Sequence, residues 1–423
     1  MNYKETIDWI YSFEKFGIKL GLERIKHICK QLGDPQNSYK VIHIGGTNGK
    51  GSVCRFLQSV LTRSGYKVGV FISPHLQRFS ERFVIDGKEI SEEDVVLLVE
   101  KVKPIVEDII KNNNTPTFFE IVTAMAFQYF KEKNVDLAVI EVGLGGRLDS
   151  TNIVNPTITI ITNVSLEHQD RLGKNIEDIT FEKSGIIKDN IPTVTGASGK
   201  ALDVIKRVAK GKNSSLTVIN NNSWKKIQGG PDWQEFLING SLKDYNVKTS
   251  MPGKFQGENV AVSLATIETL QMNGIYITDG SINEGIEKTT NPGRMEIVGF
   301  EPMILLDGAH NVAGINSLKD TLKEDFVYES LILVIGILSD KNVQEMLDII
   351  TPIADVIIVT KSHNKRACNP SKLKKMIGGE VIIKNKISDA IDYAKKVAKR
   401  QDLVCITGSL FTVGESKEHI KEI

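Results

Sequence analysis

The chain alternates two hydrophobic patterns along its length. Short apolar runs rich in β-branched residues predict buried strands, and stretches with apolar residues every three or four positions predict amphipathic helices. Residues 190–250 are expected to form strands and turns. Strands that alternate with helices predict a mostly parallel sheet covered on both faces. In the first part of the chain, strands are expected at 41–44, 66–71, 81–85, 137–142 and 157–162, and helices at 3–16, 21–32, 53–61, 91–111, 117–133, 175–188, 251–272 and 279–288.

The same alternation restarts after residues 291–294, an Asn-Pro-Gly-Arg segment typical of a hinge. A length of 423 residues also exceeds one ordinary core. We therefore predict an α/β fold with two domains. Residues 1–290 would form a P-loop NTPase-like domain with a mostly parallel sheet, and residues 291–423 a smaller Rossmann-like α/β domain. In the second domain, strands are expected at 302–306, 330–335, 355–360 and 402–406, and helices at 311–323, 342–350 and 387–399.

Composition narrows the range of partners. A hydrophobic content of 41% and a charged content of 25% are typical of a globular protein, and a formal net charge of +1 gives no general attraction to nucleic acid or membranes. No apolar run approaches about 18 residues, and the N-terminus lacks the apolar core of a signal peptide. The four cysteines are scattered without a Cys-x-x-Cys pair, which favours reduced thiols over a zinc site. We expect a cytoplasmic monomer without a nucleic-acid or membrane partner.

The first predicted strand runs into a glycine-rich segment that precedes a helix. Residues 45–52 read Gly-Gly-Thr-Asn-Gly-Lys-Gly-Ser, an order typical of a phosphate-binding loop. Backbone N–H groups of such a loop surround phosphate oxygens, and the positive end of the helix points at them. Lys50 would neutralise the β- and γ-phosphates, and Ser52 would reach toward Mg²⁺. The strict motif has Gly where Ile44 stands and Ser or Thr where Gly51 stands, so a glycine-rich turn with an incidental Lys is the alternative.

Three titratable side chains interrupt or follow later elements. Glu141 interrupts an apolar strand, where a lone carboxylate is costly to bury without a cation. We interpret it as a Mg²⁺ ligand near Lys50, with a structural ion pair as the alternative. His168 follows the strand at 157–162, and Lys183 lies in a predicted helix. Each of these two also has a structural interpretation, as a surface His and as a solvated helix Lys.

Two other nucleotide motifs are not supported. Residues 143–147 (Gly-Leu-Gly-Gly-Arg) resemble the start of a dinucleotide-binding G-x-G-x-x-G segment. However, Leu148 occupies the position of the third glycine, and no clean helix follows. The sequence also lacks the N-K-x-D motif with which a GTPase would read its base.

Polar residues also follow three predicted strands of the second domain. They occur at 307–311 (Asp-Gly-Ala-His-Asn), at 336–341 and at 408–411. Because ligands of open α/β sheets bind beyond the carboxyl ends of the strands, we expect these segments to line one cleft. Asn311 could instead serve as the cap of the next helix.

Taken in order, these motifs resemble the folylpolyglutamate synthase family, whose members often also act as dihydrofolate synthases and which belongs to the Mur-type ATP-dependent amide ligases. The resemblance runs nearly from end to end. Three positions depart from the family pattern, since Glu167 replaces an Asp, Phe255 a His and Val312 a Pro. The matched segments are 46–52, 73–76 (Ser-Pro-His-Leu), 117–120 (Thr-Phe-Phe-Glu), 141–152, 167–168, 182–185, 257–259, 292–294, 307–311 and 408–415.

The resemblance implies a role for each matched residue. Lys50, Lys183 and His310 are the implied catalytic residues, and Lys183 is expected to be carbamylated. ATP would be held by Asn48, Gly49, Lys50, Gly51, Ser52, Asn259, Arg294 and Asp307. The Mg²⁺ ligands would be Ser52, Ser73, Glu141, His168 and Lys183. The folate substrate would contact Thr117, Phe118, Phe119, Glu120, Leu148, Asp149 and Ser150, and L-glutamate would be presented by His310 and Ser409.

The implied function solves a chemical problem, because a carboxylate is a poor electrophile. ATP would phosphorylate the carboxylate of dihydropteroate or of a reduced folate, and L-glutamate would attack the acyl phosphate, with release of ADP and phosphate. This reaction belongs to folate biosynthesis and one-carbon metabolism. Lys50 and Mg²⁺ would reduce the repulsion between the two anions, and closure of a two-domain cleft would exclude water.

Two alternatives remain open. One is a phosphate-loop ATPase whose hydrolysis drives a conformational switch on a macromolecular partner. The other is a ligase that acts on a nucleotide-linked cell-wall peptide, against which residues 117–120 and 148–150 argue.

Overall fold

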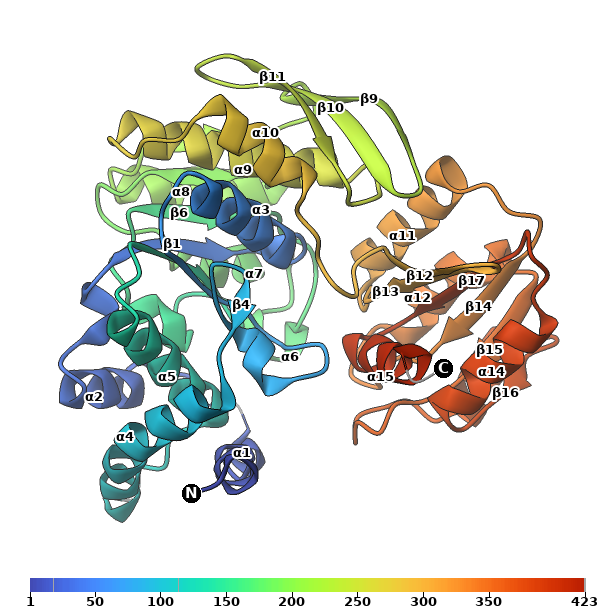
Figure 1. The fold of residues 1–423 in the computed structure, drawn as a ribbon, viewed down its shortest axis with the longest axis horizontal. Helices are drawn as coiled ribbons and strands as arrows, with labels where there is room; N and C mark the ends of the chain where they lie inside the picture. The colour runs from blue at the N-terminus through green and yellow to red at the C-terminus, as the bar shows by residue number, and fades with distance from the viewer. Residues whose placement is uncertain (18, 113, 422–423) are drawn as a thin grey trace. The chain divides into compact units, whose positions relative to one another are not determined.

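The computed structural model describes residues 1–17, 19–112 and 114–421, which fall into two compact units (Figure 1). Each unit contains its own sheet, so the predicted α/β class is confirmed. The functional boundary predicted between residues 290 and 291 stays a prediction. The N-terminal unit comprises Met1–Lys225, Leu237–Val247 and Gly257–Lys288, and the C-terminal unit comprises Lys226–Phe236, Lys248–Gln256 and Thr289–Ile423.

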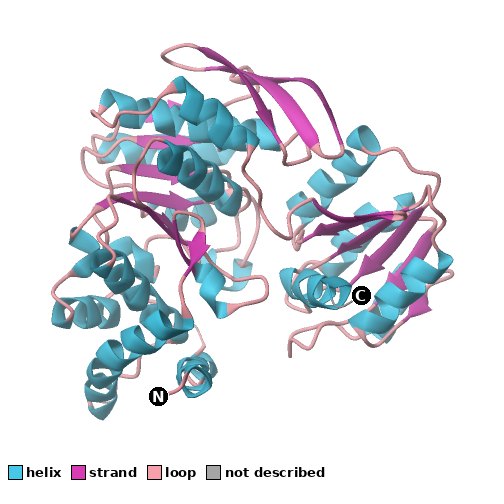
Figure 2. Cartoon of the chain, in the orientation of Figure 1, coloured by secondary structure: helices cyan, strands magenta, loops and turns pink. Residues whose placement is uncertain are grey.

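An eight-stranded sheet forms the centre of the N-terminal unit (Figure 2). From β2 to β8 all neighbouring strands pair in parallel, whereas β3 and β4 are antiparallel additions at one edge. This confirms the mostly parallel sheet that the hydrophobic alternation predicts. The strand order is β4 (Lys88–Glu89), β3 (Phe83–Ile85), β2 (Val68–Phe71), β5 (Leu137–Glu141), β1 (Lys40–Gly45), β6 (Ile158–Ile161), β7 (Thr193–Thr195) and β8 (Leu216–Val218).

Helices cover both faces of this sheet. A cluster of buried apolar side chains joins α1, α2, α4 and α5 to the face that carries Val41, Phe71 and Ile140, while α3 packs on the opposite face. The helices of this unit are α1 (Tyr3–Tyr11), α2 (Glu23–Gln31), α3 (Lys50–Arg63), α4 (Glu92–Lys111), α5 (Phe118–Glu132), α6 (Gln169–Leu172), α7 (Ile176–Ser184), α8 (Gly199–Gly211), α9 (Gln256–Met272) and α10 (Asp279–Glu287).

Local capping explains where several of these helices begin. The Ser91 side chain accepts the backbone N–H of Asp94 at the start of α4. Thr117 and Glu120 form a reciprocal capping box at the start of α5, in which each side chain accepts the other's backbone N–H. Such caps satisfy N–H groups that a helix cannot bond internally, and each contributes about 1 kcal/mol.

Helices α3 and α10 lie in close contact through a glycine. A Cβ atom at Gly285 would come within 2.7 Å of the Cα atom of Val60, so only glycine allows this approach. The Ser59 hydroxyl donates to the backbone oxygen of Gly285 at 2.7 Å, and the Ser281 hydroxyl donates to the backbone oxygen of Arg63 at 3.2 Å. The last turns of α3, the helix that begins at the glycine-rich loop, are therefore fixed against α10.

The C-terminal unit has a six-stranded sheet in which only β12 is antiparallel to its neighbour β13. A second apolar cluster joins α11, α12 and α13 to one face of this sheet. The strand order is β12 (Glu296–Phe300), β13 (Met303–Asp307), β17 (Leu403–Thr407), β14 (Leu331–Ile335), β15 (Val356–Val359) and β16 (Ile382–Ile383). The helices are α11 (Val312–Asp325), α12 (Val343–Ile350), α13 (Pro370–Ile377), α14 (Ile387–Val397) and α15 (Leu410–Lys421).

A third, three-stranded sheet contributes residues to both units. Its order is β11 (Asp244–Thr249), β10 (Trp233–Asn239) and β9 (Trp224–Gly230). This sheet falls in the segment expected to hold strands and turns, but the expectation is wrong for residues 199–211, which form α8. Ala201, Val204 and Ile205 of α8 are buried and recur at helical spacing. This spacing indicates a helix, although residues typical of turns stand on either side.

Several other helices and strands have bounds that differ from those expected from the sequence. The strand expected at 81–85 is shorter, because a 3₁₀ turn occupies Phe79–Arg82 before β3. The helix expected at 3–16 ends at Tyr11 and continues only as a 3₁₀ turn at Glu14–Phe16. The sequence analysis also missed α13 and α15, the second of which begins directly after the strand-end residues 408–409.

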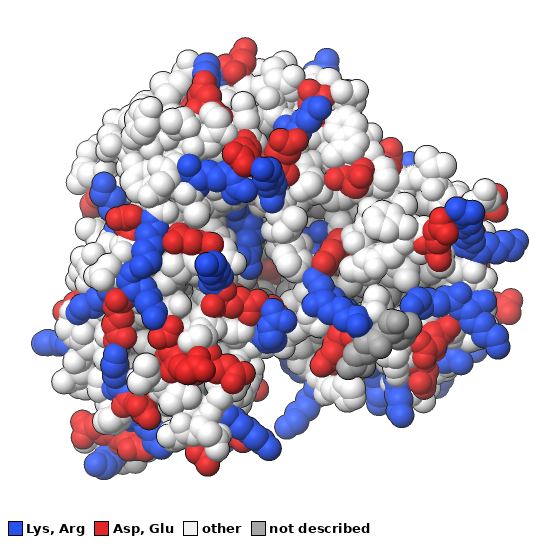
Figure 3. All heavy atoms as spheres, in the orientation of Figure 1, with Lys and Arg blue, Asp and Glu red and all other residues white. Residues whose placement is uncertain are grey.

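The surface agrees with the balanced composition. Figure 3 shows Lys and Arg side chains interspersed with Asp and Glu side chains on the visible face, without a large patch of one sign. Among the described residues, no helix combines the length and the apolar character needed to cross a membrane.

The α3–α10 contact predicts the effect of a small substitution. We expect Gly285→Ala to lower the free energy of unfolding by about 1–3 kcal/mol, because its methyl group would overlap the Val60 backbone. Chemical denaturation measures this change. Gly211→Ala in α8 is the matched control, since nothing lies within 4 Å of its Cβ position and alanine favours a helix. Equal stability of the two variants would contradict the tight contact.

Candidate active site

The glycine-rich loop connects the end of β1 to the start of α3, as predicted. Gly49 is the N-cap residue of α3 and has a φ of 83°, and Gly46 has a φ of 134°. A Cβ atom at Gly46 would overlap the hydroxyl of Thr162, and one at Gly49 would overlap the side-chain oxygen of Asn259. Both glycines are therefore required by backbone angle and by space.

The loop is held by residues that follow β6. The N–H of Thr47 donates to the backbone oxygen of Asn163 at 2.8 Å, and the N–H of Asn48 donates to the Asn163 side-chain oxygen at 2.9 Å. The hydroxyl of Thr162 donates to the backbone oxygen of Asn48 at 2.6 Å. The first-turn N–H groups of α3, including those of Gly51 and Ser52, have no acceptor within the helix and suit an anion such as phosphate.

Two lysines reach the same loop carbonyl. The Lys50 ammonium donates to the backbone oxygens of Gly46 and Thr47 at 3.1 and 3.0 Å, and the Lys183 ammonium donates to that of Gly46 at 2.9 Å. Lys183 in α7 is only 2% exposed, so its interpretation as a solvated helix Lys is wrong. The structure thus brings both predicted catalytic lysines of this unit to the phosphate loop.

Lys183 has a largely buried partner in Glu167, whose carboxylate oxygen lies 2.6 Å from its ammonium nitrogen. Burial of Glu167 opposes ionisation, but the positive charges of Lys183 and Lys50 outweigh this effect and lower the pKa of Glu167 to about 2. Burial also lowers the pKa of Lys183 from its ordinary value. The two groups form a buried ion pair beside the loop.

The predicted metal ligands include one directly joined pair. The carboxylate of Glu141 accepts the backbone N–H of Ser73 at 3.0 Å, so the ends of neighbouring strands β5 and β2 meet there. His168 is the N-cap residue of α6 and has a φ of 46°, and Ser52 lies in the first turn of α3. In the ranges 1–17, 19–112 and 114–421, no three His, Cys, Asp or Glu side chains form a metal-binding group.

This donor set suits Mg²⁺ bound together with a nucleotide. Mg²⁺ is usually held by one or two carboxylates, substrate phosphates and water rather than by a complete protein cage. A single carboxylate at Glu141, with the hydroxyl and imidazole groups that the same unit offers, therefore fits Mg²⁺ that binds with phosphate. The glycine cradle at residues 46 and 49 fits the phosphates themselves.

An aromatic wall stands next to the phosphate loop. Phe119 lies over Gly143, where a Cβ atom would come within 2.5 Å of the ring, and stacks on Phe71 with ring centroids 5.9 Å apart. Phe118 stacks on Tyr11 at 5.4 Å. The segments 117–120 and 143–150 are thus brought together at the end of β5, as a flat aromatic substrate would require.

Two carboxylates predicted to contact substrate have structural partners. Glu120 accepts the N–H and the hydroxyl of Thr117 at 2.7 and 2.9 Å and pairs with Arg24 at 3.0 Å. Asp149 accepts the backbone N–H groups of Leu144 and Thr151 at 2.8 and 3.0 Å, and burial raises its pKa. Both groups hold their segments in shape. The half-buried Leu148 and the buried Ser150 flank Asp149 in the same turn.

His43 is a buried member of this network that the sequence analysis missed. It lies on β1, and its Nε2 atom is 2.9 Å from the hydroxyl of Thr151, which in turn donates to Asp149 at 2.6 Å. Because that hydroxyl already donates, Nε2 carries the hydrogen and donates to it. Burial lowers the pKa of His43 to about 3. The sequence does hold a signal for this residue, because a His stands within an otherwise apolar strand at 41–44.

A second polar group occupies the C-terminal unit. Asp307 accepts the backbone N–H groups of Met295 and Ala309 at 3.0 and 2.9 Å, and burial raises its pKa although Arg294 opposes this shift. Arg294 and His310 both donate to the backbone oxygen of Gly308, at 2.7 and 2.8 Å. Residues 294, 307 and 310 therefore form one cluster.

Ser409 lies at the same edge of the C-terminal sheet. Strands β13 and β17 pair in parallel with Asp307 opposite Thr407, so the residues that follow them are neighbours. A Cβ atom at Gly308 would come within 2.5 Å of the Leu410 side chain. The Ser409 hydroxyl is 2.8 Å from that of Thr412. Sharing of one nucleotide between this group and the phosphate loop stays a prediction.

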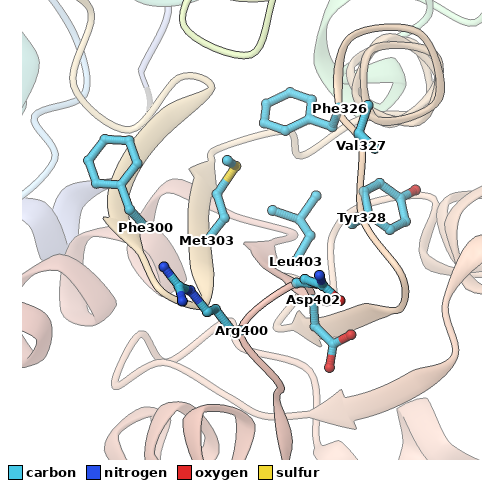
Figure 4. Close-up of a pocket in the computed structure, with 9 residues that line it drawn as sticks. Phe300, Met303, Phe326, Val327, Tyr328, Arg400, Asp402 and Leu403 are labelled. Carbon is cyan, nitrogen blue, oxygen red and sulfur yellow. The ribbon is translucent and has the colours of Figure 1, made fainter.

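A shallow pocket of the C-terminal unit lies away from this chemistry (Figure 4). Met303 and Leu403 are the first residues of β13 and β17, whereas Asp307 is the last residue of β13. The pocket therefore lies at the amino ends of these strands, away from Asp307. Its cavity volume of about 90 Å³ is too small for a nucleotide or a folate. Its lining residues are Phe300, Met303, Phe326, Val327, Tyr328, Arg400, Gln401, Asp402 and Leu403.

Comparison with protein families supports a single assignment. Residues 44–267 match the Mur ligase middle domain, and residues 293–410 match the Mur ligase glutamate ligase domain. A Bacillus subtilis protein named dihydrofolate synthase/folylpolyglutamate synthase is 36% identical over 434 aligned residues, which cover 99% of each chain.

Solved structures agree with this assignment. A folylpolyglutamate synthase from Thermotoga maritima has a TM-score of 0.86 and 40% identity, and the match covers 99% of this chain and 96% of that one. Escherichia coli FolC in complex with DHPP and ADP has a TM-score of 0.88 and 29% identity, over 100% of this chain and 98% of that one.

The buried His43 predicts a pH dependence of stability. An unfolded His binds a proton below about pH 6.5, whereas folded His43 does so only near pH 3. Its contribution to stability is therefore complete above pH ~6.5 and is lost as the pH falls, by up to about 1.4 kcal/mol per unit. His43→Gln should reduce this loss, measured by urea denaturation at about pH 7 and pH 5.

The control for this measurement is His27→Gln, at an exposed position of α2. The buried environment of His43 would be contradicted if wild type and His43→Gln lost the same stability between the two pH values.

Proposed function

The chain belongs to the Mur ligase family, within the group of folylpolyglutamate and dihydrofolate synthases, and from this membership we propose the substrates and the roles of its site residues. The protein is an ATP-dependent amide ligase. We propose that it joins L-glutamate to the carboxylate of reduced folates and also converts dihydropteroate to dihydrofolate. DHPP and ADP in the similar E. coli FolC support this assignment.

One observation carries the proposal. The phosphate loop follows β1, and the ring of Phe119 lies against Gly143 after the adjacent strand β5 and stacks on Phe71 at the end of β2. A nucleotide phosphate and a flat aromatic acid could therefore be held side by side in one unit. An ATPase switch would need the loop but would have no use for an aromatic wall beside it.

The residues of the N-terminal unit serve the activation step. ATP supplies the phosphoryl group that converts the carboxylate to an acyl phosphate, and Mg²⁺ neutralises phosphate charge. Lys50 and the first turn of α3 would bind the phosphates, for which Lys50 exchanges its present loop carbonyls. Ser52, Ser73, Glu141 and His168 would hold Mg²⁺, and Asn259 would pack on the nucleotide side of Gly49.

The residues of the C-terminal unit serve the attack by the amine. His310 and Ser409 would present L-glutamate, and Arg294 and Asp307 would contact ATP. The hydrogen bonds of Asp307 to two backbone N–H groups give this carboxylate a fixed direction, as a positioning role requires. We place the reaction in the cytoplasm with a monomeric enzyme. The four buried, unpaired thiols are consistent with a reducing compartment.

A parallel assay tests the function. Purified protein with ATP, Mg²⁺ and L-glutamate is offered dihydropteroate and tetrahydrofolate, and release of ADP and the glutamylated product are measured. We expect turnover only when a pteroate or folate and glutamate are both present. Turnover that ignores glutamate and responds to a macromolecule would support the switch instead. Turnover only with a nucleotide-linked peptide would support the cell-wall alternative.

Lys50 gives the first test of the site. Lys50→Ala should reduce turnover by at least about a hundredfold, because the transferring phosphoryl group loses its fixed positive charge. The fold should persist, since the Lys50 ammonium bonds only to carbonyls of its own loop. Product formation and the melting temperature are compared with those of Lys365→Ala, an exposed lysine remote in sequence. Near-normal turnover of Lys50→Ala would refute the phosphate role.

Lys183 tests the proposed carbamate. Lys183→Ala should lose activity, and added formate or acetate should restore part of it by replacing the carboxylate of a carbamate. The substitution also leaves Glu167 buried without its cation, which costs about 3–5 kcal/mol of stability. The double variant Lys183→Ala, Glu167→Gln removes this penalty and is the form in which rescue is measured. Absence of rescue in a folded double variant would argue against the carbamate.

A further inference from the structure

Arg82 is a buried cation next to the residues expected to contact the folate. It ends the 3₁₀ turn that precedes β3 and is only 7% exposed. The backbone N–H of Ile72 donates to the backbone oxygen of Arg82 at 3.2 Å, and β2 pairs with β3 so that Phe71 lies opposite Phe83. Arg82 therefore lies at the carboxyl end of β2, at the sheet edge where the phosphate loop follows β1.

The Arg82 guanidinium has no ion-pair partner within the described part of the chain. Its hydrogen bond runs from Nε to Nδ1 of His75, at 2.8 Å. The carboxylates of Glu14, Glu81 and Glu141 favour its charge without forming an ion pair with it, and Glu81 instead accepts three backbone N–H groups of the segment before it. Burial lowers the pKa of Arg82 to about 10, so the side chain stays charged near neutral pH.

This burial has no structural compensation in the described residues. A buried charge without an opposite charge is costly, and natural proteins pair such groups. The unpaired guanidinium of Arg82 thus indicates that a ligand of opposite charge completes its environment.

His75 and Tyr11 fix the direction of the guanidinium. Because Nδ1 of His75 accepts from Arg82, it carries no hydrogen, and the neutral ring has its hydrogen on Nε2. Nε2 lies 3.3 Å from the Tyr11 hydroxyl and donates to it. This chain of hydrogen bonds occupies the Nε edge of the guanidinium. Among the described residues, none accepts from the two terminal nitrogens of Arg82, which are left for another acceptor.

The guanidinium also lies over a ring of the expected folate site. Its central carbon is 5.4 Å from the centroid of the Phe118 ring, which stacks on Tyr11 with centroids 5.4 Å apart. Phe118 is half-buried, so part of its ring is exposed. A flat aromatic acid beside this ring would have a cation close to its carboxylate. The parallel N–H groups of a guanidinium match the two oxygens of a carboxylate.

We propose that Arg82 binds a carboxylate of the acid substrate. The inference rests on the proposed function and deepens it, because it takes the Phe118–Phe119 wall as the folate site. Dihydropteroate offers only the carboxylate that is to be phosphorylated, whereas a folate carries two carboxylates on its glutamate, one of which is extended. The phosphates of ATP are the less suitable partner, since the backbone N–H groups of the loop after β1 already suit them.

Arg82→Met tests this contact, because it removes the charge and the N–H donors but keeps an unbranched side chain. Titration calorimetry compares dihydropteroate, tetrahydrofolate and a dihydropteroate analogue with a methyl group in place of the carboxylate. The acid whose carboxylate Arg82 holds should bind about ten- to a hundredfold more weakly than to the wild type, as for the loss of a charge-assisted hydrogen bond. The affinities for the methyl analogue and for ADP should stay within about twofold.

The two acids identify the carboxylate. Weaker binding of both acids to Arg82→Met assigns the guanidinium to the carboxylate that is phosphorylated. Weaker binding of tetrahydrofolate alone assigns it to the second carboxylate of the glutamyl group. In either case the KM for that acid should rise by a similar factor, and the KM for ATP should not change.

Two further variants support the comparison. Arg78→Met is the matched control, because Arg78 lies just before the same turn, is exposed and pairs with Glu89 at 2.6 Å. It should bind both acids as the wild type does. Arg82→Lys keeps the charge but not the paired N–H donors, so it should show the same selective loss to a smaller degree. It provides the test if Arg82→Met does not fold.

Wild-type affinity of Arg82→Met for both acids would overturn the inference. An equal loss for the methyl analogue would also overturn it, since a merely structural role of Arg82 would weaken both ligands alike. A loss confined to ADP would assign the guanidinium to the nucleotide instead. These outcomes leave the proposed function intact as long as the wild-type chain ligates glutamate to either acid. Failure of the wild-type chain to do so would overturn both.

Discussion

The N-terminal unit depends on one packing constraint, the close approach of the loop backbone at residues 46–49 to the ends of β6 and α9. Thr162 and Asn259 occupy the space where side chains on Gly46 and Gly49 would stand. Glycine at these two positions lets the loop backbone curve closely, as a phosphate-binding turn of backbone N–H groups requires. The same constraint places both lysines that are predicted to be catalytic, because Lys50 and Lys183 share the carbonyl of Gly46.

The carboxylates around the phosphate loop differ in the groups that they contact. Lys183 and Glu167 neutralise each other as an ion pair, whereas the Glu141 carboxylate accepts the backbone N–H of Ser73. Glu120 and Asp149 instead accept capping and turn hydrogen bonds, so they hold the segments around Phe118 and Phe119 in shape. The carboxylates near the carboxyl ends of these strands thus fall into two groups. Some accept hydrogen bonds that fix the shape of their own segment, and others could bind a ligand.

The sequence predicted the features that have a local signature. The phosphate loop, the caps at Ser91 and Thr117 and the mostly parallel sheet follow from glycine, lysine and hydrophobic spacing over a few residues. Contacts between distant segments have no such signature, so the contacts of His43 with Thr151 and of Asn163 with Asn48 became visible only in three dimensions. Helix α8 was missed although its buried residues recur at helical spacing, because its glycine and lysine content resembles that of a surface turn. For Glu120 and Asp149 the sequence could not show that each carboxylate already accepts backbone N–H groups of its own segment.

The contact at Gly285 has a mechanical meaning. The chain leaves the N-terminal unit at Lys288, one residue after α10 ends. Since α10 is locked to α3, and α3 begins at Lys50, the crossover segment starts from a rigid anchor that is continuous with the phosphate loop. A rotation of the backbone after residue 288 would therefore start from a helix that is packed against α3, rather than from a freely moving segment.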